Sequence, residues 1–338
     1  MIAIIIVGFN NKKDILQCFS SIQKLTYKNY KIIFVDNHSQ DGSLESIKKK
    51  YPEVVVIENK ENYGFAKGSN IGIQKALDLG ADYIFLLNPD TIVDKDCLRI
   101  LRENADQKTI LQPLILLYDK KKTNLVNTAG NFLHYLGFSY CGNYKEKAAK
   151  FDKKKEIPLA SGAAMFIPAQ IIKNIGFFDE KFFMYNEDVD FCWRARIAGY
   201  SIKLLPQAKI WHKYEFSKNK NKFFYVERNR LLFLVKNFQV KTLVLILPIL
   251  LIHEFVGYLH SLKSGWFFSR LKVPWSFLTL LSDALKKRSQ IQKKRKIPDC
   301  LLKKYWIAQI DFSEIEISDQ KIYNSLMKGF WWTIRPFI

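Results

Sequence analysis

The chain has 338 residues, 48% of them hydrophobic, which is enough for one large α/β domain with an appended region and excludes global disorder. Its net charge of +21 is uneven, with a net +7 in residues 1–212 and a net +14 in residues 213–338. Such a field attracts polyanions: nucleic acid, anionic lipid headgroups or phosphorylated substrates. Five scattered cysteines without a CxxC pair favour reduced thiols over a disulfide framework or a zinc site.

The first ninety residues alternate between strand and helix patterns. The opening apolar run stops at Val7 and lacks a basic leader, so we expect a strand there rather than a signal peptide. Strands are predicted at Ile2–Val7, Ile32–Val35, Val54–Ile57 and Tyr83–Leu87, with helices at about 12–25, 44–50 and 66–79 between them. This order predicts a Rossmann-like, mostly parallel sheet with helices on both faces, whose ligands bind beyond the carboxyl ends of the strands.

The pattern is less regular between residues 110 and 215. A strand is predicted at Ala163–Ile167, followed by a helix that starts near Pro168. A second helix is predicted from Glu187 to Ala198, where Gly199 can adopt the left-handed conformation that ends helices.

The composition changes again from about residue 216, where the chain becomes basic and aromatic. Thr242–Ile252 is an uncharged run of eleven residues that contains Pro248. Because about 20 residues are needed to span a bilayer, we expect a membrane-surface or re-entrant helix here. Residues 286–296 hold seven basic side chains and no acidic one.

Polar motifs follow the predicted strands. Asp36 lies in VDNHSQDGS, residues 35–43, where its carboxylate can accept hydrogen bonds from a base or a sugar, although an ordinary strand-to-helix turn also fits. The glycines of ENYGFAKGSNIG, residues 61–72, lead into a helix whose N-terminus suits a pyrophosphate. A glycine-containing loop without a ligand is the alternative interpretation. The first strand is followed by GFNN rather than GxGxxG, which argues against a nicotinamide or flavin dehydrogenase.

Three further positions suggest acid–base or metal chemistry. Asn88 and Asp90 end the motif FLLNPD. The carboxylate of Asp90 can bind a divalent cation, but Asn-Pro-Asp also fits an ordinary β-turn without a metal. Glu187 and Asp188 open a predicted helix, where an ionised carboxylate can act as a general base or simply cap the helix. His212 follows a short strand and is either a metal ligand or a structural histidine.

Taken in order, these motifs resemble those of family 2 glycosyltransferases of the GT-A fold, especially the bacterial rhamnosyltransferase-like branch that builds surface polysaccharides. The resemblance covers about residues 2–212. It rests on IIIVGFNN, VDNHSQDGS, NYGFAKGSNIG, FLLNPD, SGAAMF, GFFDEKFFMYNEDVDFCWRARIAGY and the following His212.

The resemblance implies a role for each candidate residue. Asp36 would bind the nucleotide base, and Asp90 and His212 would bind Mg²⁺ or Mn²⁺, with Asn88 in place of the first acid of a DxD-type motif. Asp188 would be the general base, with Glu187 beside it. The other residues implied to line the nucleotide-sugar site are Phe9, Asn10, Asn62, Gly64 and Asn70. Attack by an acceptor hydroxyl opposite the leaving nucleotide would invert the anomeric configuration through a transition state resembling an oxocarbenium ion.

The expected organisation is a GT-A catalytic domain over residues 1–215 and a basic, aromatic helical region over 216–338. Within the catalytic domain we expect a nucleotide-sugar half at 1–110 and an acceptor half at 111–215. The expected protein works at the cytoplasmic face of the cell membrane as a peripheral enzyme, on a dTDP-rhamnose or UDP-hexose donor and a lipid-linked or polysaccharide acceptor. Its C-terminal region would dock onto anionic lipid, although packing on the main domain or oligomerisation stays open.

Three other functions remain open at this point. The chain could transfer a sugar to polyprenyl phosphate, or bind nucleotide sugars without catalysis. The third hypothesis is a basic protein that binds nucleic acid. It is disfavoured because the positive charge lies beside long apolar stretches and no recognised nucleic-acid module is present. We therefore expect no nucleic-acid partner.

Overall fold

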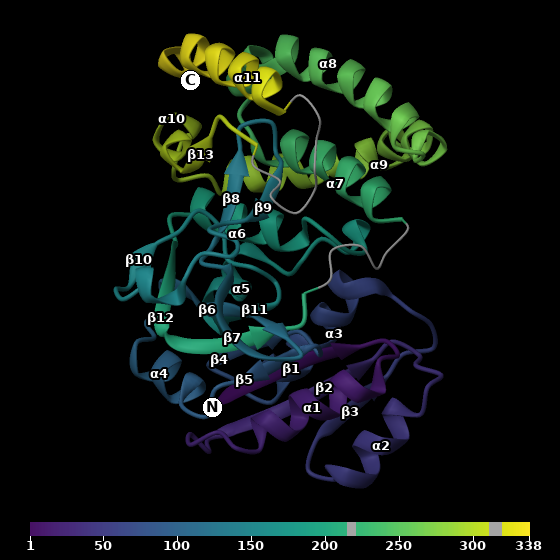
Figure 1. The fold of residues 1–338 in the computed structure, drawn as a ribbon, viewed down its shortest axis with the longest axis vertical. Helices are drawn as coiled ribbons and strands as arrows, with labels where there is room; N and C mark the ends of the chain where they lie inside the picture. Colours follow the sequence, from purple (N-terminus) through teal and green to yellow (C-terminus); the bar gives the residue numbers. More distant parts are fainter. Residues whose placement is uncertain (215–220, 311–319) are drawn as a thin grey trace. The chain divides into compact units, whose positions relative to one another are not determined.

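The computed structural model describes residues 1–214, 221–310 and 320–338 (Figure 1). Contacts divide the chain into two compact units. The first, which we call the sheet unit, holds Met1–Asn131, Cys141–Phe191 and Tyr200–Glu215. The second, the helical unit, holds Phe132–Tyr140, Cys192–Gly199 and Phe216–Ile338.

The sheet unit opens with the alternation that the sequence predicts. Its strands are β1 (Ile2–Gly8), β2 (Tyr30–Asp36), β3 (Val55–Glu58) and β4 (Tyr83–Leu87), and its helices are α1 (Lys12–Ile22), α2 (Ser43–Lys50) and α3 (Gly64–Asp78). β1 pairs in parallel with β2 and β4, and β2 pairs in parallel with β3. The carboxyl ends of all four strands therefore lie at one edge of the sheet.

Helices cover both faces of this parallel part of the sheet, and β1 is therefore buried on both sides. Ile4 and Ile6 belong to the same apolar cluster as Ile15 and Phe19 of α1. On the opposite face α3 approaches closely, since a Cβ on Gly72 would lie 2.5 Å from a methyl group of Ile5. An apolar strand without alternation is what a doubly covered sheet requires.

The rest of the sheet unit extends this sheet with strands that are mostly absent from the sequence-based prediction. They are β5 (Thr91–Val93), β6 (Thr109–Asp119), β7 (Lys121–Thr128), β10 (Lys155–Glu156), β11 (Ala164–Pro168) and β12 (Ser201–His212). Its remaining helices are α4 (Cys97–Glu103), α5 (Ala169–Ile175), the 3₁₀ turns Ala148–Lys150 and Glu180–Phe182, and the start of α6 (Glu187–Ile197).

The strand order is β10-β12-β6-β11-β4-β1-β2-β3, with β5 paired to β12 and β7 paired to β6. β11 runs antiparallel to β4, so its first residue, Ala164, lies opposite Leu87 at the last position of β4. The start of β11 and the ends of β1, β2 and β4 therefore share an edge. The predicted α/β class with a mostly parallel sheet is confirmed.

In the described part of the helical unit, the long helices are α7 (Lys222–Asn237), α8 (Val240–Lys263), α9 (Phe267–Lys293) and α11 (Gln320–Ile334). Shorter elements are α10 (Asp299–Leu302), the 3₁₀ turns Lys303–Tyr305 and Arg335–Phe337, and a small sheet of β13 (Trp306–Ile307), β8 (Asn131–His134) and β9 (Ser139–Cys141). α8 is longer than the predicted eleven-residue run, and its 24 residues are long and apolar enough to cross a membrane.

Candidate active site

Asp90 and His212 meet because of a short antiparallel pairing. β5 begins directly after Asp90 and pairs with the last residues of β12, with Thr91 opposite His212. This register leaves His212 Nε2 3.2 Å from Asp90 Oδ1, and the imidazole is 7% exposed. Two residues 122 positions apart in the sequence are thus held side by side by three residue pairs of backbone ladder.

The other imidazole nitrogen contacts Asn127 of β7, which is 1% exposed. Asn127 Oδ1 lies 2.9 Å from His212 Nδ1 and accepts its hydrogen, so Nε2 presents a lone pair toward Asp90. A neutral His212 therefore leaves two acceptor atoms facing each other at a distance that adjacent ligands of one cation require, about 3 Å for bonds near 2.1 Å. The carboxylate suits Mg²⁺ or Mn²⁺, and the imidazole favours the softer Mn²⁺ of the two.

Asn88, two residues before Asp90, holds a further oxygen without a partner in the described part of the chain. Its backbone N–H donates to Ala163 O at 2.9 Å, and its carbonyl oxygen accepts from the Thr91 hydroxyl. Its buried side-chain Oδ1 has no hydrogen-bond partner among residues 1–214, 221–310 and 320–338. A buried amide oxygen costs free energy unless something binds it, so it is available to a ligand or a metal-bound water.

Asn127 is a site residue that the sequence did not reveal, and its substitution tests the cation site. Asn127→Ala is expected to weaken Mn²⁺ binding about 10–100-fold, because the imidazole loses the contact that fixes its tautomer and orientation. Asn127→Asp should bind Mn²⁺ at least as well as the parent. Mn²⁺ titration followed by electron paramagnetic resonance measures both, with Asn131→Ala as a control for loss of a nearby amide. Parent-like affinity in Asn127→Ala would contradict this positioning role.

Glu187 and Asp188 occupy the first turn of α6, and the structure gives the two carboxyl groups different surroundings. Asp188 accepts two backbone hydrogen bonds, from Gly162 N to Oδ2 and from Val189 N to Oδ1, both at 2.8 Å. Burial raises the pKa of Asp188, and these N–H groups act against that rise. Burial also raises the pKa of Glu187 well above its ordinary 4.5, and the neighbouring Asp188 charge raises it further.

The Glu187 carboxyl is therefore the member of the pair that holds a proton. Its buried Oε2 finds no hydrogen-bond partner in the part of the chain that the structure describes, whereas Asp188 has charge-stabilising donors on both oxygens. Environments that separate two carboxyl groups in this way mark out an acid and a base.

The pH dependence of stability follows from the raised pKa of Glu187. A carboxyl group whose pKa is raised on folding costs nothing below its unfolded pKa and costs progressively more as the pH rises above it. Glu187→Gln is expected to stabilise the protein at pH 7.5 by at most about 4 kcal/mol, since each pH unit above 4.5 contributes at most about 1.4 kcal/mol. At pH 4 the gain should vanish.

Urea unfolding at the two pH values measures this difference, and the exposed Glu61→Gln is the matched control. An equal gain at both pH values, or a loss of stability at pH 7.5, would show that folding does not raise the pKa of Glu187.

Asp36 and the residues after β1 form a second group at the same edge. Asp36 is 1% exposed, and its Oδ2 accepts from Ser39 N, while its Oδ1 lacks a hydrogen-bond donor within the described ranges. Asn10 binds the same loop, because its N–H donates to Ser39 Oγ and its Oδ1 accepts from Gln40 N. Phe9 is 49% exposed, so its ring is available for stacking on a base.

The predicted donor loop of residues 61–72 is held tightly. Asn62 Oδ1 accepts from Gly64 N, and Gly64 has a φ of +75°. A Cβ on Gly64 would lie 2.5 Å from the carbonyl oxygen of Phe183, so this position requires glycine. The loop therefore lies against the segment that leads into Glu187 and Asp188.

Asn70 has a different environment from the other candidates. Its Oδ1 accepts from Phe178 N, and its Nδ2 donates to Phe178 O and Glu180 Oε1. The whole amide is engaged with the 178–180 segment, so the geometry supports a role in holding this segment rather than in contacting a donor. Its predicted contribution to donor binding stays a prediction.

The candidates converge through the sheet. Asn88 N donates to Ala163 O, and Gly162, one residue earlier, donates to Asp188, so Asp188 lies beside the end of β4. Asp90 follows β4 directly, and Asp36 ends β2, two strands away at the same edge. Asp188, the Asp90–His212 pair and the buried carboxylate of Asp36 thus share one edge of the sheet.

The chain is similar in sequence to two named proteins of glycan synthesis. The chain is 29% identical over 198 residues to the low-salt glycan biosynthesis hexosyltransferase Agl10 of Haloferax volcanii, covering 58% of this chain and 61% of that protein. It is 25% identical over 217 residues to poly-beta-1,6-N-acetyl-D-glucosamine synthase of Staphylococcus aureus, covering 62% of this chain and 49% of that one. The match thus spans less than two thirds of these relatives.

The fold is similar to that of a solved structure, GalNAc-T7 with UDP, GalNAc and Mn²⁺. The TM-score is 0.60 at 16% identity, over 72% of this chain and 48% of that chain. The family model "Glycosyl transferase family 2" matches residues 3–176, which include β1 to β4 and β11. The chain belongs to glycosyl transferase family 2.

Proposed function

We propose that this protein is a metal-dependent, inverting hexosyltransferase that moves a sugar from a nucleotide-sugar donor to a hydroxyl group of a glycan acceptor. The observation that carries the proposal is the convergence of Asp90, His212 and Asp188 at one sheet edge. Family membership and two relatives named for hexosyl transfer and glycan synthesis support it.

In the proposed reaction the residues divide between donor and acceptor. Asp36 accepts hydrogen bonds from the nucleotide base through its unused Oδ1, and Phe9 stacks on the base. Asp90 and His212 would hold Mg²⁺ or Mn²⁺, which would neutralise charge on the diphosphate of the departing nucleotide.

Asp188 removes the proton of the acceptor hydroxyl, whose oxygen then forms a bond to the anomeric carbon. The bond from that carbon to the nucleotide oxygen breaks on the opposite side, which inverts the configuration without a covalent enzyme intermediate. Glu187 keeps its proton and so leaves the negative charge of the pair on Asp188.

The donor is proposed to be dTDP-rhamnose or a UDP-hexose, and the acceptor a lipid-linked or polysaccharide hydroxyl at the cytoplasmic face of the membrane. Solved structures of similar fold include one with UDP and Mn²⁺, which adds support for a nucleotide donor and a divalent ion. Transfer to polyprenyl phosphate is the second candidate.

A screen of dTDP- and UDP-sugars with Mn²⁺, followed by transfer assays on the tightest binder, tests the proposal. Metal-dependent binding of one donor and a product of inverted anomeric configuration are expected. Retention of the anomeric configuration, or donor binding that is unchanged by chelation of the metal, would contradict it. Product analysis with polyprenyl phosphate as acceptor separates the two candidates.

A further inference from the structure

α8 carries a continuous apolar side that the described structure leaves exposed. Its members recur at intervals of three and four residues, so they lie along one side of the helix. They are Val244, Leu247, Leu251, Phe255, Leu259 and Leu262, each 48–66% exposed. Of the most apolar 18-residue window of α8, only 17% is buried within the structure. We call this surface the outer face of α8.

The opposite side of α8 packs inside the helical unit. Thr242, Ile246, Ile249 and Ser261 are buried on it. Gly257 allows a close approach there, because a Cβ at this position would lie 2.5 Å from the guanidinium of Arg270. One side of this helix therefore faces protein along its whole length, which an isolated membrane-spanning helix would not do.

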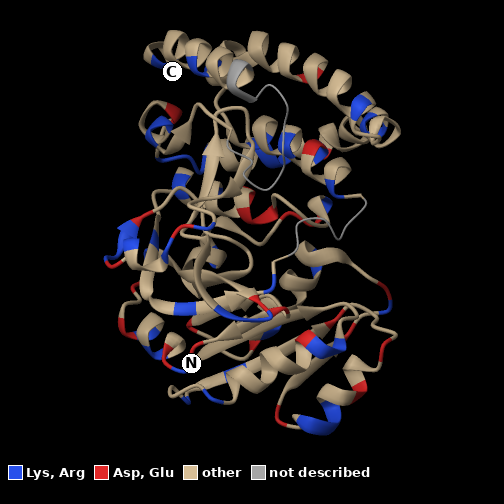
Figure 2. Ribbon diagram, in the orientation of Figure 1, with Lys and Arg blue, Asp and Glu red and all other residues tan. Residues whose placement is uncertain are grey.

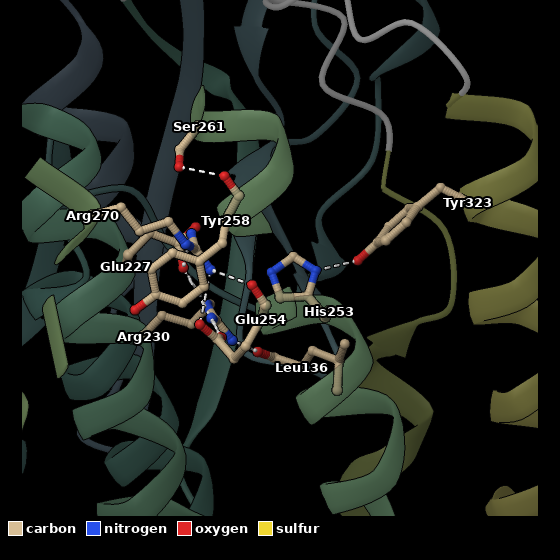
Figure 3. Close-up of polar contacts among 9 residues, drawn as sticks. All are labelled: Leu136, Glu227, Arg230, His253, Glu254, Tyr258, Ser261, Arg270 and Tyr323. Carbon is tan, nitrogen blue, oxygen red and sulfur yellow. Dashed lines mark hydrogen bonds and ion pairs between the residues drawn. The ribbon is translucent and has the colours of Figure 1, made fainter. Parts of the chain in front are cut away.

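Glu254, near the middle of α8, fixes this orientation. Its carboxylate forms ion pairs with Arg230 of α7 and Arg270 of α9, the second at 2.8 Å (Figure 3). Arg230 is fully buried and Arg270 is 2% exposed, and both also contact Glu227. If α8 left this site to cross a bilayer, Glu254 would enter the hydrocarbon and two buried guanidinium groups would lose a partner.

The same cluster could be mistaken for a metal site, since Glu227, His253 and Glu254 offer three ligand atoms within 4.8 Å of one another. Two arginine guanidinium groups already neutralise both carboxylates, and His253 Nδ1 is engaged with the Tyr323 hydroxyl. The cluster is better suited to locking α8 onto α7 and α9 than to holding an ion.

The charges around the outer face indicate what covers it. Figure 2 shows almost no charge along α8 between its ends. Both acidic side chains of α8 and α9, Glu254 and Asp283, are engaged in ion pairs. The exposed charges on the two helices are lysines, at positions 241, 263, 272, 286 and 293. A second copy of the chain would bring two such sets of lysines together, and their like charges would repel each other. Anionic headgroups would instead neutralise these lysines.

We propose that α8 lies in the plane of an anionic membrane surface, with its outer face among the acyl chains and the exposed lysines of α8 and α9 at the phosphates. Although its length would allow α8 to span the bilayer, the Glu254 ion pairs hold it flat. A second exposed apolar stripe, formed by Phe268, Leu271 and Trp275, lies at the start of α9. This inference does not rest on the proposed glycosyl transfer.

Flotation with vesicles tests membrane binding. The parent protein should float with vesicles of equimolar phosphatidylcholine and phosphatidylglycerol at physiological salt. Leu251→Gln with Phe255→Gln should weaken partitioning about tenfold or more, because two exposed apolar side chains are lost from the contact. Leu125→Gln in the sheet unit, also an exposed leucine, is the matched control and should float normally.

Depth measurement distinguishes a flat helix from a spanning one. Nitroxide labels at positions 244, 251 and 262, in a Cys300→Ser background, should all report similar, shallow depths. A label at 251 near the bilayer centre with shallow ends would overturn the flat orientation. Equal flotation of parent and double variant would overturn the surface assignment. Failure of the parent to float, with a dimer that the double variant abolishes, would assign the face to a second copy instead.

Discussion

Asp188→Asn is expected to lower the rate of sugar transfer by about 10²–10⁴-fold, because an amide cannot take the proton of the acceptor hydroxyl. Donor affinity should stay close to that of the parent, because the predicted donor contacts lie on other residues. The amide can still accept from at least one of the two backbone N–H groups, so the site should keep its shape. Steady-state kinetics and calorimetric titration of donor with Mn²⁺ measure the two quantities separately.

Glu187→Gln is the natural control, since it removes the neighbouring carboxyl group by the same isosteric change. Because Glu187 is the proton-holding member of the pair, this variant should retain most of the transfer rate. If Glu187→Gln is inactive and Asp188→Asn is active, the two roles are exchanged. If both turn over normally, the base lies elsewhere.

Asp90→Asn should weaken Mn²⁺ binding by at least about 100-fold, more than the loss of a residue that only orients a ligand. The reason is that an amide oxygen carries no net charge to set against the cation, while His212 Nε2 loses the carboxylate 3.2 Å away. Donor binding measured with and without Mn²⁺ should then become insensitive to the metal.

Asp94→Asn controls for the loss of a carboxylate in the same region, since Asp94 follows β5 and accepts from the Asp96 N–H. It should bind Mn²⁺ like the parent. Unchanged Mn²⁺ affinity in Asp90→Asn would remove Asp90 from the cation site and leave its contact with His212 as a plain hydrogen-bonded pair.

The strand positions in the first half of the sheet unit can be predicted from the sequence, because these strands are short, apolar and bounded by turn residues. The predicted bounds of β4 agree with the structure, and each predicted end of β1, β2 and β3 lies within two residues of the observed one. The single-sequence pattern suffices here because both faces of these strands are buried, so composition alone marks them.

The strands β6 and β12 were harder to predict because each contains a proline, which normally argues against an interior strand. In the structure, Pro113 pairs with Leu205 next to an irregularity in the ladder, and Pro206 lies within it. The irregularity accommodates residues that cannot donate a ladder hydrogen bond. A local sequence pattern does not reveal which partner strand will supply such an irregularity.

The helix predicted at Thr242–Ile252 is shorter than α8, again because tertiary contacts that a local sequence pattern does not reveal decide where the element ends. The uncharged run ends at Ile252 because His253 and Glu254 follow, and in isolation these residues suggest the end of an apolar segment. In the fold their partners come from α7, α9 and α11, so the helix continues to Lys263. Only the tertiary contacts reveal that the polar residues are paired.

Within the site, the motifs singled out Asp90 and His212, which the structure brings together, but not the groups that orient the candidate residues. Asn127 lies in an otherwise unremarkable polar strand, and Gly162 acts through its backbone N–H. A single asparagine or a backbone donor has no sequence signature of its own, and its role appears only when the strands are placed.

The three-residue pairing of β5 with β12 also has a dynamic consequence. Such a short ladder is a segment that can open locally without global unfolding, and its opening would move Asp90 away from His212. A cation bound to both side chains would oppose that opening. Amide hydrogen exchange at Ile92, which pairs with Trp211, and at Asp94, whose N–H donates to Lys209 O, should therefore slow as Mn²⁺ is added. The affinity for the ion and the opening of the β5–β12 pairing are then linked by a single equilibrium.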